Sequence, residues 1–118
     1  MEIIVGRPKE VDLSFSAPPS KSYTHRGLIA AGLADGTSHI IRPLISGDTR
    51  ITMQALSDFG VPLFDDRDRI TVEGTGGILE CREGLVLDMG NSGTSFRLIT
   101  SMALICGKPV TITGSPRM

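Results

Sequence analysis

The chain has 118 residues, of which 40% are hydrophobic and 21% charged, and its formal net charge is −1. This composition is typical of a soluble globular domain or part of one, and it excludes a broad basic surface for nucleic acid. Because no apolar stretch could span a bilayer and the N-terminus lacks a signal-peptide pattern, we expect a cytoplasmic protein without nucleic-acid or membrane partners.

The first expected elements are two short strands, at residues 2–5 and 11–16. Residues 17–19 cannot form regular structure, because consecutive prolines remove two donors and fix φ, so this segment is a candidate crossing point between domains. A serine-capped helix should follow from about residue 20 to residue 34.

The later elements alternate between strands and helices. In chain order we expect a strand at 37–42, a helix from 46–48 to about 59, a hairpin at 62–65 and 69–72, a flexible turn at 74–77, weaker strands at 78–81 and 85–87, a helix at 92–106 and a strand at 109–113. This order predicts α/β or α+β layering. The first and third helices are apolar over most of their circumference, which predicts burial on several sides.

The cysteines and histidines show no metal-binding spacing. Cys81 and Cys106 lie far apart without a CxxC motif, which favours two free thiols in a reducing cytoplasm. His25 and His39 have no useful spacing to each other or to the cysteines. We therefore expect no metal.

A short pattern occurs twice, at residues 20–26 and 91–97. Each copy starts with a small polar residue, carries a hydroxyl at its fifth position, ends in Arg and precedes an apolar run. Each run stops at a glycine, Gly36 or Gly107, so that both features repeat with the same offset of 71 residues. The sequence therefore predicts an internal repeat in which both copies open a helix.

Both copies suit an anion. A helix N-terminus exposes unpaired N–H groups and carries partial positive charge, which attracts phosphates and carboxylates. The first copy adds Lys21 and Arg26, and residues 90–94 of the second copy are small enough for a ligand to approach closely. If the repeat brings the two helix starts together, they form one site for a small, multiply charged anion.

Each feature alone has an ordinary explanation. A serine at a helix start is usually only a cap, a lone Lys or Arg is usually solvated, and Asp48 would cap the second helix. The glycine-rich segment 90–94 lacks the pattern of a nucleotide-binding loop, and Arg117 in a terminal loop would mean little alone. The combination is more specific than its parts.

Taken together, the motifs resemble the enolpyruvylshikimate-phosphate synthase (3-phosphoshikimate 1-carboxyvinyltransferase) family over essentially the whole chain. The stretches that carry the resemblance are Pro19-Ser20-Lys21-Ser22 with Arg26, Ser46-Gly47-Asp48-Thr49, Gly90-Asn91-Ser92-Gly93-Thr94 with Arg97, and Gly114-Ser115-Pro116-Arg117-Met118. They correspond to the N-terminal portion of a longer protein, which agrees with the uncapped end after residue 113.

The resemblance implies a fold of two domains, each built from three βαβαββ units around buried parallel helices. Residues 1–17 would belong to the first domain, and residues 18–118 would form one and a half repeats of the second. Family members are monomeric, but apolar faces normally covered by later repeats could make this chain self-associate.

The resemblance also implies an activity. Family members transfer the enolpyruvyl group of phosphoenolpyruvate to the 5-hydroxyl of shikimate 3-phosphate and release phosphate, without a cofactor or metal. The resemblance implies that the catalytic Lys21 contacts both substrates and that Ser22 and Arg26 bind shikimate 3-phosphate. It implies that Asn91, Gly93 and Thr94 line the phosphoenolpyruvate pocket, which glyphosate also occupies, and that Arg117 binds phosphoenolpyruvate. Asp48 would support the site.

The chain departs from the family in two respects. It has Gly47-Asp48 where the family has two consecutive acids, and the family's principal acid and base residues lie beyond residue 118. We expect the isolated chain to be inactive, because a cleft between two domains cannot close when one domain is missing. Two alternatives stay open: a non-catalytic anion-binding module, and the sister transferase that acts on UDP-N-acetylglucosamine, although that family carries a Cys near 115–117 and this chain does not.

Overall fold

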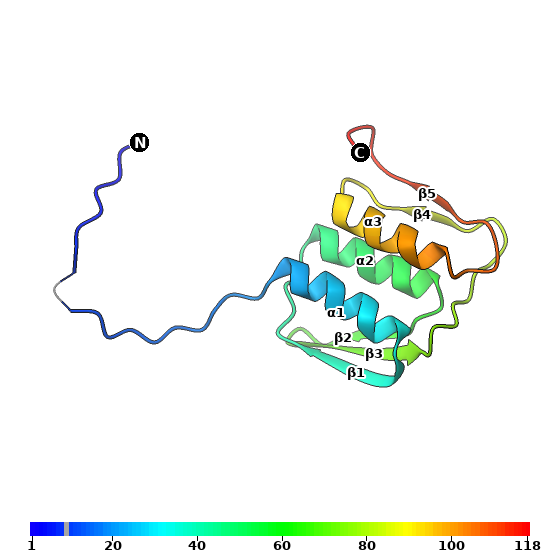
Figure 1. The fold of residues 1–118 in the computed structure, drawn as a ribbon, viewed down its shortest axis with the longest axis horizontal. Helices are drawn as coiled ribbons and strands as arrows, with labels where there is room; N and C mark the ends of the chain where they lie inside the picture. The colour runs from blue at the N-terminus through cyan, green and yellow to red at the C-terminus, as the bar shows by residue number, and fades with distance from the viewer. Residues whose placement is uncertain (9) are drawn as a thin grey trace.

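The computed structural model describes residues 1–8 and 10–118. An extended N-terminal arm (residues 1–8 and 10–19) leads into a body of helices and strands (residues 20–118; Figure 1). The elements of the body are α1 (Lys21–Leu33), β1 (Asp35–Ile41), α2 (Gly47–Asp58), β2 (Leu63–Asp65), β3 (Arg69–Thr75), β4 (Val86–Asp88), α3 (Gly93–Ala103) and β5 (Thr111–Thr113). This order of helices and strands confirms the predicted mixed fold.

The arm carries the pattern of a strand without forming one. Val11, Leu13 and Phe15 alternate with polar residues, yet their exposed fractions are 65%, 80% and 85%. The predicted strands at 2–5 and 11–16 are therefore wrong for this chain. A strand needs a neighbouring backbone to receive its hydrogen bonds, and none of the described residues pairs with the arm.

Serine caps begin all three helices. Ser20 Oγ accepts from the Tyr23 N–H at 3.3 Å, and Ser46 forms a reciprocal capping box with Thr49 at the start of α2. The predicted helix starts are thus correct to within about one residue. The third helix is shorter than predicted, because α3 ends at Ala103 and residues 104–106 continue as tight turns.

The strands form two small sheets. One has the order β1-β3-β2 with antiparallel neighbours, and the other pairs β4 with β5 in parallel. Residues 78–81 form no strand, and the turn expected at 74–77 begins two residues later, because β3 continues through Gly74 to Thr75. A side chain at Gly74 would collide with the carbonyl oxygens of Ala31 and Ala34, so glycine lets β3 lie against the end of α1.

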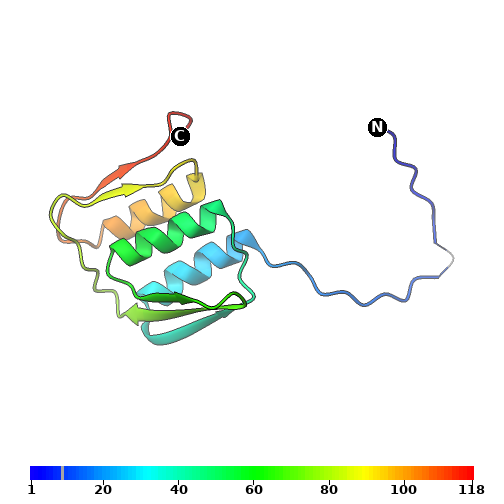
Figure 2. The ribbon, with the colours of Figure 1, turned by 180° about the vertical axis from the view of Figure 1, so that it is seen from behind.

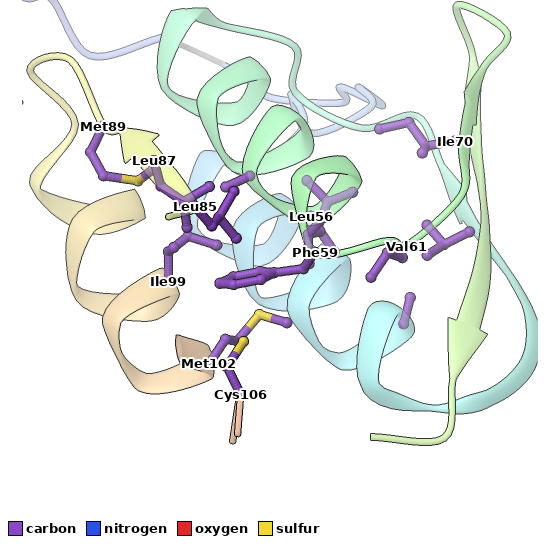
Figure 3. Close-up of a cluster of buried hydrophobic side chains, with 14 residues drawn as sticks. Leu56, Phe59, Val61, Ile70, Leu85, Leu87, Met89, Ile99, Met102 and Cys106 are labelled. Atoms are coloured by element: carbon purple, nitrogen blue, oxygen red, sulfur yellow. The ribbon is translucent and has the colours of Figure 1, made fainter. Parts of the chain in front are cut away.

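The three helices lie side by side and run in the same direction, with α2 in the middle (Figures 1 and 2). Their N-termini therefore lie at one end of the body. The core lies between the helices and the two sheets, and Figure 3 shows its largest members, including Leu56, Phe59 and Ile99. The prediction of helices buried on several sides is wrong, since Tyr23 on α1 is 73% exposed and Leu104, just after α3, is 83% exposed.

The burial pattern confirms the internal repeat. Residues buried on α1 and α3 recur with the predicted 71-residue offset: Thr24 with Ser95, Leu28 with Ile99, and Ala31 with Met102. The caps differ by one position, because Ser20 corresponds in sequence to Asn91 but the cap of α3 is Ser92. The two helices thus present equivalent faces to the core, while α3 starts one residue later.

Cys81 and Cys106 form a disulfide, with their Cα atoms 5.7 Å apart, so the predicted free thiols are wrong. The loop after β3 passes the end of α2, where the Glu80 N–H donates to the Phe59 carbonyl at 2.9 Å. This contact brings Cys81 next to the turn that follows α3. The pairing arises from the fold, which is why the sequence spacing gave no sign of it.

Among the described residues, no helix combines the length and apolar character needed to cross a membrane.

Candidate functional site

The candidate residues gather at the end of the body where the three helices begin. Lys21 opens α1, Asp48 lies in the first turn of α2, and Gly93 opens α3. The helix dipoles therefore point their positive ends toward one region (Figure 1). This arrangement confirms that the repeat brings the helix starts to the same side of the molecule.

Lys21 and Asp48 form an ion pair across this end. The Lys21 Nζ donates to Asp48 Oδ2 at 2.7 Å, and the two side chains are 47% and 36% exposed. Pairs this exposed contribute little to stability, because water screens them and ordering two side chains costs entropy. The pair thus leaves a cation accessible at the start of α1.

Arg26 and Ser22 lie on the exposed side of α1. The guanidinium carbon of Arg26 lies 4.8 Å from the centre of the Tyr23 ring, a cation–π contact that holds the side chain along the helix. Within the described part of the chain, Arg26 makes no ion pair. Its N–H donors therefore remain available for an anionic ligand.

A second cluster surrounds the start of α3. A pocket of about 700 Å³ is lined by Asn91, Gly93, Phe96, Arg97, Ile112, Thr113, Gly114, Ser115, Arg117 and Met118. The segment after β5 folds back onto this start, since the Ser115 N–H donates to the Gly90 carbonyl at 2.6 Å and its hydroxyl donates to Asn91 Oδ1 at 3.2 Å. The fold thus brings Arg117 next to the glycine-rich loop.

Gly93 leaves open space beside this pocket. A methyl group at its Cα would meet no described atom within 4 Å. Thr94 is exposed beside the pocket but does not line it. Neither do Lys21, Ser22 and Arg26, so the structure gives two neighbouring clusters where the sequence predicted one site.

Arg97 also lines this pocket, although the sequence motifs did not predict a binding role for it. It lines the same pocket as Arg117, which places a second guanidinium near the start of α3. The repeat contained the signal, because Arg97 occupies the position of Arg26 in the second copy.

Asp48 links the two clusters. Its carboxylate holds Lys21, and its backbone carbonyl accepts from the Ser95 hydroxyl at 3.1 Å. Ser95 is fully buried in the first turn of α3. Through Asp48, the first turn of α2 is therefore joined to the start of α1 by an ion pair and to the start of α3 by a hydrogen bond.

His25 lies buried behind the Lys21 cluster. Burial lowers the pKa of the His25 imidazole, and Lys21 lowers it further, while Asp48 raises it. Its Nδ1 lies 2.9 Å from Thr52 Oγ1 on α2. Sequence spacing gave His25 no role, because its partners come from other helices.

No group of three or more His, Cys, Asp or Glu side chains within residues 1–8 and 10–118 has the geometry to hold a metal ion.

Comparison with protein families gives the decisive match. The family model for EPSP synthase (3-phosphoshikimate 1-carboxyvinyltransferase) matches residues 5–118. The chain belongs to the EPSP synthase family. The 3-phosphoshikimate 1-carboxyvinyltransferase of Methanosphaerula palustris is 56% identical over 110 residues, which are 92% of this chain and 26% of the relative. The corresponding protein of Methanoregula boonei is 52% identical over 108 residues, with the same two shares.

Solved EPSP synthase structures support the fold. The enzyme from Acinetobacter baumannii superposes with a TM-score of 0.77 at 33% identity, over 87% of this chain and 24% of that one. This match confirms the α/β fold implied by the resemblance. The chain spans about a quarter of the length of the EPSP synthases it matches.

The match also weighs against the sister transferase. That family carries a cysteine near the loop at 115–117, whereas the disulfide joins Cys81 to Cys106 and neither lines the pocket around Arg117.

Proposed function

We propose that this chain supplies part of the substrate site of a 3-phosphoshikimate 1-carboxyvinyltransferase. The reaction transfers the enolpyruvyl group of phosphoenolpyruvate to the 5-hydroxyl of shikimate 3-phosphate and releases phosphate. Two multiply charged anions must approach each other in this reaction. Preorganised cations and helix N-termini lower the cost of that approach, and both occur at one end of this body.

The cluster at the start of α1 binds shikimate 3-phosphate in this proposal. Lys21 contacts both substrates and acts in catalysis, while Ser22 and Arg26 hold the phosphorylated ring. The exposure of all three residues supports these roles, as does the absence of an ion pair on Arg26 within the described residues. Asp48 supports the site by orienting Lys21 from 2.7 Å.

The pocket at the start of α3 binds phosphoenolpyruvate, and this pocket is the observation that carries the proposal. It joins Asn91 and Gly93 to Arg117, although these residues come from segments separated by a helix and a strand. Thr94 lies at its edge. A guanidinium beside open N–H groups suits a phosphate or carboxylate. Glyphosate, an anion that competes for this pocket in the family, would contact the same residues.

The arm belongs to a different domain from the body in this proposal. In the whole protein, residues 1–17 would contribute strands to a first domain, where a partner backbone that the described part of this chain does not provide would pair with them, and residues 18–118 form part of a second domain. The support is the strand-like alternation of the arm together with the exposure of its apolar residues, since such residues are normally buried. A cytoplasmic, monomeric whole protein is part of the same proposal and follows from the family alone.

Binding of phosphoenolpyruvate to the chain, in the presence of shikimate 3-phosphate, tests the proposal. We expect Arg117→Ala to weaken binding at least tenfold, since a hydrogen bond to a charged group contributes about 1.5–3 kcal/mol and about 1.4 kcal/mol corresponds to tenfold. Arg82→Ala removes the same charge at the opposite end of the body, where Arg82 lies near Gly107 and Lys108, and should change affinity less than twofold. Equal losses in both variants would contradict the proposal.

A further inference from the structure

A buried chain of hydrogen bonds crosses all three helices near their starts. His25 Nδ1 on α1 lies 2.9 Å from Thr52 Oγ1 on α2, and Thr52 Oγ1 lies 2.9 Å from Ser95 Oγ on α3. Ser95 Oγ in turn lies 2.7 Å from Ser92 Oγ, the cap of α3. These four side chains are at most 1% exposed. A polar chain this deep must satisfy its own donors and acceptors.

The Asp48 carbonyl fixes the direction of the chain. A carbonyl oxygen can only accept a hydrogen bond, so the Ser95 hydroxyl donates its single proton to the backbone carbonyl of Asp48 at 3.1 Å. Ser95 Oγ must then accept from both Thr52 and Ser92. With its proton directed to Ser95, the Thr52 hydroxyl can only accept from His25.

His25 therefore carries its proton on Nδ1. Its Nε2 is buried and has no hydrogen-bond partner among the described residues. A neutral ring with a bare Nε2 leaves one weak acceptor unsatisfied, whereas a charged ring would bury an unpaired donor as well as a charge near Lys21. The lowered pKa of His25 agrees with the neutral form.

The chain reaches both clusters of the candidate site. It ends at the backbone carbonyl of Asp48, the residue whose carboxylate holds Lys21, and at Ser92, the cap that begins α3 beside Gly93. The distance between the two clusters thus depends on side chains that touch neither substrate. Burial in a low-dielectric interior makes these bonds stronger than exposed ones.

We infer that His25 and Thr52 are positioning residues, which hold the starts of α1 and α3 at the separation that the two anionic substrates require. This inference rests on the proposed function. His25 acts as the Nδ1–H donor at one end of the chain, and Thr52 is the only described side chain through which it joins α3 by hydrogen bonds. Their effect on the substrates is transmitted through Asp48 and Ser92.

The first test is spectroscopic and needs no ligand. Nitrogen-15 NMR of the labelled chain at neutral pH should show a protonated Nδ1 and an unprotonated Nε2 for His25. Thr52→Val keeps the side-chain shape but removes the hydroxyl, and should change this signature. Thr52→Ser keeps the hydroxyl and should restore it. A proton on Nε2 in the unmodified chain would overturn the inference.

The second test measures coupling with shikimate 3-phosphate. In the unmodified chain, binding at the start of α1 should also shift the amide signals of Ser92 and Gly93. Thr52→Val should abolish this remote response and weaken affinity at least threefold, while Thr52→Ser keeps both. If Thr52→Val does not fold, Ser95→Ala breaks the same chain of hydrogen bonds and should cause the same loss of affinity and of the remote response.

The two readouts separate the possible failures. If shikimate 3-phosphate does not bind the unmodified chain but the His25 signature is as described, the proposed function fails and with it the positioning role. If the ligand binds but Thr52→Val and Thr52→Ser respond identically, the positioning role fails and the proposed function stands.

Discussion

The ammonium group of Lys21 lies 2.7 Å from the carboxylate of Asp48, although the two residues are 27 positions apart. The pair joins the start of α1 to the first turn of α2. Because both side chains keep more than a third of their surface exposed, the pair can open when an anion arrives. The pair thus orients the cation with little effect on the stability of the fold.

Asp48→Asn should therefore change the free energy of unfolding by less than about 1 kcal/mol. Urea denaturation at neutral pH measures this difference. The Asp48 carbonyl still accepts from Ser95 in the variant, so the buried chain of hydrogen bonds is retained. A loss of several kcal/mol would show that the ion pair holds the fold together.

Stability should fall as the pH drops below 6.5, the ordinary pKa of histidine, because burial lowers the pKa of His25 in the folded state. The unfolded chain then binds a proton that the folded chain does not. The contribution of neutral His25 to the free energy of unfolding is fully present above pH 6.5. It is lost as the pH falls toward the lowered pKa, with a slope of at most about 1.4 kcal/mol per pH unit.

Urea denaturation at pH 7.5 and pH 5.5 checks this prediction. His25→Asn removes the titrating group and should reduce the difference between the two conditions. Since Asp48 and Lys21 act on His25 with opposite signs, the comparison is best made in a background that keeps both. An identical pH dependence in His25→Asn would contradict the account.

Reduction of the Cys81–Cys106 disulfide should destabilise the chain. The bond encloses β4 and α3. Cross-linking residues 25 apart lowers the entropy of the unfolded chain, which stabilises the fold by about 3.5 kcal/mol in the entropy model. Thermal unfolding with and without a dithiol should show a lower Tm in the reduced chain. The double variant Cys81→Ser with Cys106→Ser should unfold at one Tm under both conditions. An equal Tm for the wild-type chain with and without the dithiol would contradict the disulfide.

Gly93→Ala should leave the fold intact but affect ligands. The added methyl group meets no described atom within 4 Å, and alanine favours a helix more than glycine does. The methyl group should instead crowd the phosphoenolpyruvate pocket, and glyphosate should lose more affinity because it is the longer ligand. Competition binding of the two ligands measures this. Equal losses would argue against the placement of Gly93 in the pocket.

Local sequence signals predicted most elements of the body. Serine caps, hydrophobic spacing and glycine stops act within a few residues, so α1, α2 and the hairpin of β2 and β3 appear close to their expected bounds. The 71-residue repeat predicted that residues 20–26 and 91–97 each open a helix, as α1 and α3 do. The arm was mispredicted because a strand depends on a partner backbone, which the pattern of residues 11–16 alone cannot supply.

Features that depend on distant contacts could not be predicted. Cys81 meets Cys106 only because the loop after β3 is fastened to the end of α2. His25 meets Thr52 only because α1 and α2 pack side by side. The candidate site was predicted as a set of residues, but its division into two clusters joined through Asp48 follows from packing.

The most direct test of the central claim is an NMR titration of the isotope-labelled chain with shikimate 3-phosphate. We predict a dispersed spectrum in which the signals of Lys21, Ser22 and Arg26 shift on binding. Arg26→Ala should weaken binding, whereas Arg82→Ala should not. A dispersed spectrum in which these three residues do not respond would contradict the claim that the helix starts form an anion site.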